Sequence, residues 1–188
     1  MEEKSKKRDV ASLLLTTSRR TKPGIAAFVK HMTRVVPYAT RVQRGKSGLK
    51  ELAAEMERRG TDKLIIVQNH KGNPGKLVFC ELSEGMLRFR AVATIKGVVL
   101  PKGNGKEECS SLRVELDEEL KEDPHALNLH SLIQEYFVED MFHPVAGGPC
   151  ILRIQKDDGL LILIFLDRET GRTLPLSVKI SSVELLEQ

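Results

Sequence analysis

One short stretch, residues 63–68, constrains the fold more than any other part of the sequence. Its centre, Leu64 to Val67, is apolar at four consecutive positions. A strand with one exposed face alternates apolar and polar residues, whereas a strand covered on both faces, as in a parallel sheet, is continuously apolar. We therefore expect residues 63–68 to form an interior parallel strand of an α/β fold.

The residues before this strand predict a strand–helix–strand–helix order. Strands are expected at residues 11–16 and 39–43. After each of them, apolar residues recur every three or four positions, which predicts helices with one buried face. The first helix begins near Pro23, and the second begins after Ser47, its expected cap, and ends at Gly60. The expected buried stripe of the second helix is Leu49, Leu52, Ala53 and Met56.

The rest of the chain predicts strands and turns around a third helix. That helix is expected to have Asp123 as its cap and Pro124 in its first turn, to bury residues as far as Met141, and to end at His143 and Pro144. The expected strands are residues 76–82, 87–93, a further segment to 100, 111–116, 150–155, 160–166 and 173–180. The parallel layer should thus give way to antiparallel pairing.

The three cysteines, Cys80, Cys109 and Cys150, are scattered without a CxxC pair. This spacing argues against a disulfide framework and against a zinc site, so we expect three buried thiols, no metal and no cofactor. No apolar run approaches the roughly 20 residues of a membrane helix, and the amino terminus does not resemble a signal peptide. We expect a cytoplasmic protein without a membrane partner.

Positive charge is concentrated in the first third of the sequence. Residues 1–60 hold 15 of the 30 Lys and Arg but only 6 of the 26 Asp and Glu. Such a concentration favours a polyanion as partner, although a basic solvated surface without a partner has the same composition.

Basic and polar side chains follow each of the three expected parallel strands. Because parallel strands end at the same edge of a sheet, these segments should lie together, and two of them lead into helix amino termini, which favour anions. Aromatic residues make up only 4% of the chain, so phosphate contacts rather than base stacking should lead the binding of RNA. The predicted RNA-binding residues are Thr17, Ser18, Arg19, Arg20, Lys22, Arg44, Lys46, Asn69, His70 and Lys71.

Four segments resemble the Brix domain of ribosome-assembly proteins. They are the Thr-Ser-Arg run at the end of Leu13 to Arg19, Arg44-Gly45 before the second helix, Thr61 to Val67, and His70 to Pro74. Together these segments span about 60 positions, which makes the match more specific than any one of them.

The resemblance implies one Brix-like domain over residues 1–188, in the single-domain archaeal form. It implies two similar halves, residues 10–90 and 91–188, each a mixed sheet with helices like the anticodon-binding domain of class IIa aminoacyl-tRNA synthetases. It further implies a role in ribosome biogenesis through binding precursor rRNA or another structured RNA, with a nucleolar location in a eukaryote. The carboxyl-terminal half, with its acidic run at residues 115–123, is a candidate surface for ribosome-assembly proteins.

Two other classes of function remain open from the sequence. A βαβαβ order also suits a nucleotide-binding enzyme, but residues 72–76 and 103–106 lack the spacing of a phosphate-binding P-loop, and His70 has no evident catalytic partner. We therefore expect a protein that is not an enzyme. The second alternative is a protein-binding scaffold within a ribonucleoprotein particle, for which the basic residues would be incidental.

Overall fold

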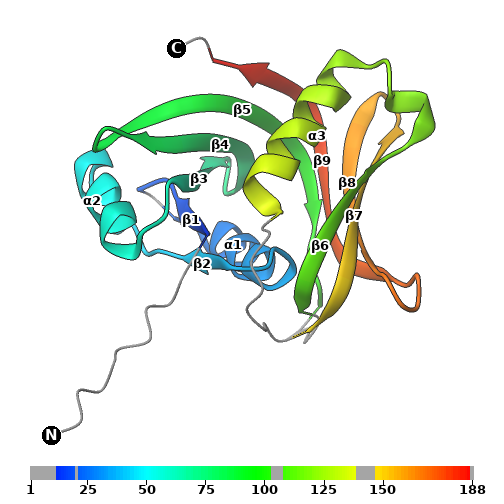
Figure 1. Ribbon diagram of the computed structural model, residues 1–188, viewed down its shortest axis with the longest axis horizontal. Helices are drawn as coiled ribbons and strands as arrows, with labels where there is room; N and C mark the ends of the chain where they lie inside the picture. The colour runs from blue at the N-terminus through cyan, green and yellow to red at the C-terminus, as the bar shows by residue number, and fades with distance from the viewer. Residues whose placement is uncertain (1–11, 20, 103–107, 139–146, 187–188) are drawn as a thin grey trace, which may run out of the picture.

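The computed structural model describes residues 12–19, 21–102, 108–138 and 147–186 (Figure 1). Within these ranges the chain forms nine strands, three α-helices and one short 3₁₀ helix. The strands are β1 Leu13–Thr17, β2 Ala39–Arg41, β3 Lys63–His70, β4 Asn73–Ser83, β5 Met86–Val99, β6 Cys109–Leu116, β7 Gly148–Asp157, β8 Leu160–Asp167 and β9 Thr173–Leu185. The helices are α1 Pro23–Val35, α2 Leu49–Arg59, the 3₁₀ helix η1 Glu118–Leu120, and α3 Pro124–Phe137.

All the strands of the described chain join one sheet in the order β2-β1-β3-β4-β5-β9-β8-β7-β6. β1 lies between β2 and β3 and is parallel to both, which confirms the predicted parallel layer. β6 and β7 are also parallel, and the other neighbours are antiparallel. The sheet is mixed and curled, as Figure 1 shows.

The helices cover both faces of the amino-terminal strands. α1 and α3 share a core cluster with one face of the sheet, and α2 forms a second cluster with the other face. β3 contributes Ile65 and Val67 to the first cluster and Leu64 and Ile66 to the second. This two-sided burial is the reason for the continuous apolar run that the sequence shows at this strand.

The two ends of the sheet are joined through β5 and β9, which pair from Ala91 with Leu185 to Val99 with Ser177. A further link is made between β4 and α3, where the rings of Phe79 and Tyr136 meet edge to face with centroids 5.1 Å apart. The larger core cluster therefore contains residues from the first strand to the last.

Strand pairing follows the same pattern at both ends of the chain. In the first part β1 is parallel to β3, and β3, β4 and β5 follow in antiparallel order. In the second part β6 is parallel to β7, and β7, β8 and β9 follow in antiparallel order.

Several predicted boundaries are wrong in detail. The segments expected at residues 87–93 and up to 100 are one strand, because the bulges at Ile95 and Lys96 interrupt the register without a turn and Gly97 pairs with Lys179 of β9. The third helix ends at Phe137 because Val138 is extended, and the predicted contributions of Met141 and His143 lie outside the described residues. Its cap is confirmed, since Asp123 accepts hydrogen bonds from the next two backbone N–H groups beyond Pro124.

The expected start of the second helix is also wrong. Gly48, not Ser47, is the residue that precedes the first turn, and it offers no side chain to cap the helix. Leu49 is 39% exposed because, as the first residue of the helix, it lies at the helix end; Leu52, Ala53 and Met56 are buried as predicted.

The prediction of three free thiols is wrong for two of them. Cys109 and Cys150 form a disulfide that links the neighbouring strands β6 and β7, while Cys80 is a buried free thiol. The two bonded residues are 41 positions apart, and only the parallel pairing of their strands brings them together. A spacing rule for adjacent cysteine pairs does not detect such a bond.

Candidate nucleic-acid interface

The carboxyl ends of the parallel strands β1, β2 and β3 lie at one edge of the sheet. The chain continues there into the β1–α1 connection, the β2–α2 connection and the β3–β4 turn. We call the predicted binding residues at this edge the basic rim: Thr17, Ser18, Arg19, Lys22, Arg44, Lys46, Asn69, His70 and Lys71. The tenth predicted residue, Arg20, lies outside the described residues.

The first two of these segments approach each other through two arginines. A Cβ atom built on Gly48 would lie 3.6 Å from the Arg19 Nη2 atom, so Arg19 reaches the start of α2. Arg44 donates a hydrogen bond from Nε to the Ser47 carbonyl at 3.1 Å. The pKa of Arg44 is lowered, first by burial and then by the positive charge of Arg19. Neither arginine has a salt bridge to a described carboxylate, so this pair concentrates positive charge.

The third segment approaches the first one at the start of α1. The Ser18 N–H donates to the Val67 carbonyl at 2.9 Å, which ties the β1–α1 connection to β3. A Cβ atom on Gly24, in the first turn of α1, would lie 3.6 Å from the Gly72 carbonyl oxygen. The turn that contains Lys71 is therefore packed against the start of α1.

The predicted residues around the β3–β4 turn do not all lie in a loop. Residues 68–70 belong to β3, and Lys71 and Gly72 form the turn, both with positive φ. The Asn69 side chain accepts the Gly72 N–H through Oδ1 at 2.7 Å, so this oxygen holds the turn. His70 packs against Gly75 so closely that any Cβ there would lie 2.3 Å from the His70 Cβ. Asn69, His70 and Lys71 are all exposed.

Two predicted contact residues are turned inward. Thr17 is 6% exposed, and its hydroxyl forms a hydrogen bond with the Thr21 hydroxyl. The Ser18 Oγ atom is buried and has no hydrogen-bond partner within the described part of the chain. These two hydroxyls are therefore turned away from a ligand at the rim, whereas Arg19, Lys22, Lys46 and Lys71 are exposed.

Two helices begin at the rim without a side-chain cap. α1 follows Lys22 and has Pro23 in its first turn, and α2 follows Gly48. The first N–H groups of a helix lack partners inside the helix and attract anions. One of them is satisfied, because the Gly48 N–H donates to Glu51 Oε2 at 2.9 Å. At α1, Pro23 has no N–H and the Ile25 N–H donates to the Lys22 carbonyl at 3.1 Å, which leaves the Gly24 N–H. That group and the first-turn N–H groups of α2 favour a negatively charged ligand beside the arginine pair.

A polar hollow, which the sequence did not predict, adjoins the rim. It measures about 340 Å³ and is lined by Arg41, Val42, Gln43, Ser47, Glu51, Leu52, Glu55 and Arg59. These residues come from the edge strand β2, the segment after it and the outer side of α2. Only the edge position of β2 brings them together, and no motif in the sequence marks that position.

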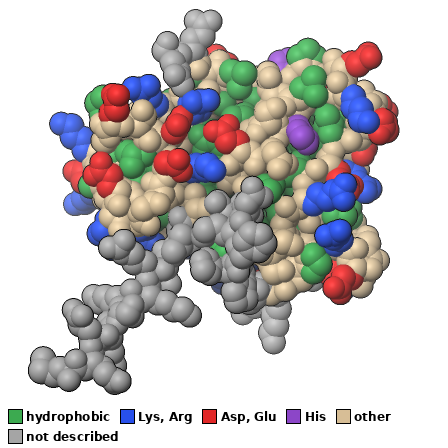
Figure 2. Space-filling model, in the orientation of Figure 1, with side chains coloured by type: hydrophobic (Ala, Val, Ile, Leu, Met, Phe, Trp, Pro, Cys, Tyr) green, Lys and Arg blue, Asp and Glu red, His purple; other side chains and the backbone are tan. Residues whose placement is uncertain are grey.

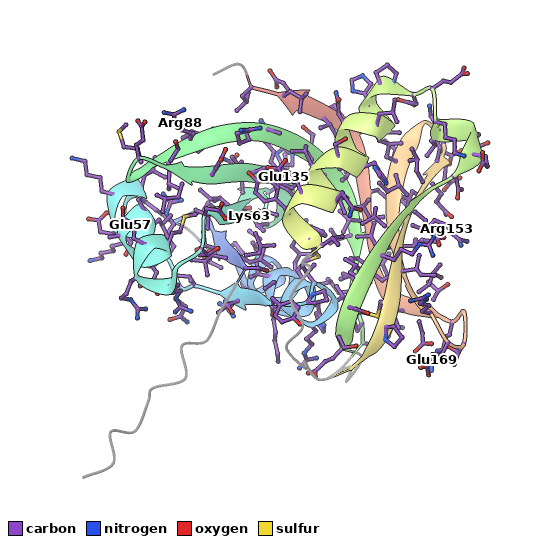
Figure 3. All side chains as sticks on the ribbon, viewed as in Figure 1. Glu57, Lys63, Arg88, Glu135, Arg153 and Glu169 are labelled. Atoms are coloured by element: carbon purple, nitrogen blue, oxygen red, sulfur yellow. A yellow bond between two sulfur atoms is a disulfide. The ribbon has the colours of Figure 1, made fainter. Side chains whose placement is uncertain are left out.

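The carboxyl-terminal part of the sheet presents mixed charge. Glu115 accepts a hydrogen bond from Arg153 at 3.1 Å, and Asp123 accepts one from Lys156 at 2.9 Å. Figure 3 shows Arg153 on the side of β7 that faces away from α3. Figure 2 likewise shows acidic and basic side chains intermixed over the face in view. The acidic run of residues 115–123 is thus partly neutralised by basic residues of β7.

The described ranges contain no group of three or more His, Cys, Asp or Glu side chains arranged to hold a metal ion. No helix among these residues is long and apolar enough to cross a membrane.

No protein-family model matches the chain. A curated protein of Aeropyrum pernix, named a probable Brix domain-containing ribosomal biogenesis protein, is 44% identical over 61 residues, which cover 32% of this chain and 34% of that protein. A protein of the same name from Pyrococcus horikoshii is 29% identical over 104 residues, or 55% of this chain and 46% of the relative. The matches to these curated relatives thus span less than half of their length.

Solved structures cover more of the chain. The crystal structure of a probable ribosomal biogenesis protein from Aeropyrum pernix superposes with a TM-score of 0.71 at 25% identity, over 93% of this chain and 98% of that one. An archaeal Imp4-like protein shares the fold, with a TM-score of 0.67 at 17% identity over 92% of this chain and 99% of its own. The resemblance predicted from the sequence is confirmed: this chain is related to archaeal Brix domain-containing ribosomal biogenesis proteins.

Proposed function

We propose that this protein binds RNA through the basic rim and acts in ribosome biogenesis, in the processing of precursor rRNA or the assembly of a ribosomal subunit. The observation that carries the proposal is the approach of Arg19 to Arg44 beside the start of α2, where neither arginine forms a salt bridge to a described acidic group. The names of the related archaeal proteins support the ribosomal context.

The chemistry of the rim suits a phosphate backbone. Guanidinium groups form paired hydrogen bonds with phosphate oxygens, and helix N–H groups add further donors. Lys46 follows β2 and Lys71 follows β3, so positive charge extends along the sheet edge on both sides of β1. Binding should therefore follow the phosphate backbone and the shape of the RNA more than its sequence.

We expect RNA affinity to fall steeply with salt and to be lost when Arg19, Arg20, Arg44, Lys46 and Lys71 are changed together to Ala. Each phosphate that is neutralised contributes about 0.7 (single strand) to 0.9 (duplex) to the slope of log affinity against log salt, so the variant should lose most of that slope. Filter binding of precursor rRNA fragments across a salt series measures both quantities.

A matched control removes five exposed charges outside the rim, Arg88, Lys96, Arg113, Lys121 and Arg168. This control should keep most of the affinity, and circular dichroism should show that both variants remain folded. Equal losses in the two variants would contradict a localised rim. Flat or absent binding by the folded protein would instead favour the scaffold function, with protein partners at the carboxyl-terminal half.

We further propose that the domain consists of two related halves, residues 10–90 and 91–188. The same order of parallel and antiparallel pairing in β1, β3, β4, β5 and in β6 to β9 supports two related halves, with β5 continuing past residue 90 from the first half into the second. In this proposal each half corresponds to the anticodon-binding domain of class IIa synthetases. Only the first half carries the basic rim, so the two halves have separate roles, with RNA at the first and ribosome-assembly proteins as candidate partners of the second.

A further inference from the structure

The polar hollow beside the rim has a different chemistry from the rim itself. The rim offers cations and N–H donors, whereas the hollow combines donors of Arg41, Gln43 and Arg59 with the carboxylates of Glu51 and Glu55. Two carboxylates repel a phosphate. A nucleobase carries donors and acceptors on the same edge, so it is the part of a nucleotide that suits such a lining.

The two carboxylates of the hollow are not equivalent. Glu55 accepts hydrogen bonds from both Arg58 and Arg59, which lower its pKa to about 2. Its carboxylate is therefore charged, and both of its oxygens already accept hydrogen bonds. Glu51 uses Oε2 to accept the Gly48 N–H, and its Oε1 has no hydrogen bond to another described residue. An open carboxylate oxygen is therefore available at the side of the hollow nearest the rim.

Two residues that line the hollow, Ser47 and Glu51, also contact the rim or the start of α2 beside it. Ser47 lines the hollow and also accepts, through its carbonyl, the hydrogen bond from the rim residue Arg44. Glu51 lines the hollow and holds the Gly48 N–H at the start of α2, where Arg19 lies. A nucleotide whose phosphate contacts the arginine pair thus has the hollow directly beside it.

We propose that the hollow receives one unpaired base of the RNA strand bound at the rim, and that it prefers guanine. This inference rests on the proposed function. The Watson–Crick edge of guanine presents two neighbouring N–H donors, which match the open Oε1 of Glu51 and the second lone pair of its Oε2, whose first lone pair accepts the Gly48 N–H. Its O6 and N7 atoms are acceptors, which match the Gln43 amide and the Arg41 guanidinium. A volume of about 340 Å³ lies at the lower end of the range for small-ligand sites.

The test uses fluorescence anisotropy with labelled seven-nucleotide RNAs of uridine that carry guanosine, inosine or adenosine at the centre. Inosine lacks the exocyclic amino group, which removes one of the two donors. The wild-type protein should bind the guanosine strand about tenfold more tightly than the adenosine strand, a modest value for a two-bond base contact. The inosine strand should lie between them.

Glu51→Gln should abolish this preference while leaving the salt slope unchanged, because the amide can still accept the Gly48 N–H but replaces one acceptor oxygen with a donor. Gln43→Ala, which lies outside the helix, should reduce the preference without any effect on α2. Glu57→Gln is the matched control, since Glu57 is an exposed residue of the same helix that does not line the hollow (Figure 3).

The outcomes separate this inference from the proposed function. Salt-dependent binding that is equal for all three strands would overturn the base site and leave the rim intact. A preference for guanosine that survives in both Glu51→Gln and Gln43→Ala would place base recognition elsewhere. An absence of salt-dependent binding to any RNA would overturn the rim and the base site together.

Discussion

Replacing Cys109 and Cys150 with Ser is expected to lower the free energy of unfolding by about 4 kcal/mol relative to the oxidised protein. The disulfide closes a loop of 41 positions that contains η1 and α3. In the chain-entropy account, such a cross-link stabilises the fold mainly by restricting the unfolded chain, and the effect grows with the length of the loop. Urea unfolding followed by circular dichroism measures the difference.

A reducing agent supplies the matched control for this prediction. It should destabilise the wild-type protein to about the level of the double variant and leave the double variant unchanged. Thiol titration of the denatured protein without reductant should detect one thiol, from Cys80, and three after reduction. Three thiols before reduction, with no response of stability to reductant, would contradict the cross-link.

Phe79→Ala is expected to cost about 3–5 kcal/mol, the usual range for loss of a buried aromatic ring. Phe79 is 0% exposed in β4, and its ring meets the ring of Tyr136 from α3 edge to face. The substitution therefore removes buried area, leaves a cavity and breaks an aromatic pair that connects the first part of the sheet with the helix of the second. Thermal and urea unfolding both measure this loss.

Tyr136→Phe provides a sharp comparison at the same contact. Burial raises the pKa of Tyr136, and its hydroxyl has no hydrogen-bond partner among the described residues. Removal of an unpaired buried hydroxyl is close to neutral or stabilising, so this variant should unfold at the wild-type urea concentration or above it. If Tyr136→Phe were as damaging as Phe79→Ala, the contact would depend on the hydroxyl and not on ring packing.

The sequence predicts the amino-terminal part of this fold well because local pattern and tertiary position agree there. Leu64 to Val67 are apolar because two helices cover the strand, and Gly60 ends α2 with a φ of 69°, in the region that favours glycine. The order of strands and helices up to β3 follows from such features.

Other features depend on contacts between distant residues and leave no local trace. Bulges near Ile95 let β5 continue past Gly97, although a glycine in a strand often indicates an interruption. The cross-link of Cys109 with Cys150 depends on the pairing of β6 with β7. The hollow depends on β2 being an edge strand beside α2, a fact of strand order that the sequence of β2 does not contain.

The candidate site also divides into a part that follows from the order of the elements and a part that follows from contacts between distant residues. The basic residues of the rim were predicted because parallel strands share an edge, and that argument needs only the order of strands and helices. The inward positions of Thr17 and of the Ser18 hydroxyl were not predicted, because they depend on contacts with Thr21 and with the end of β3.

The pairing of β5 with β9 has a consequence for how the chain folds. β5 ends at Val99, yet its partner begins at Thr173, so about 70 residues must be synthesised before the two strands can pair. Until then β5 has an open edge, of the kind that pairs readily with other chains. The middle of the sheet is therefore completed last during synthesis, and a chain that stops before Thr173 would be the form most prone to aggregate.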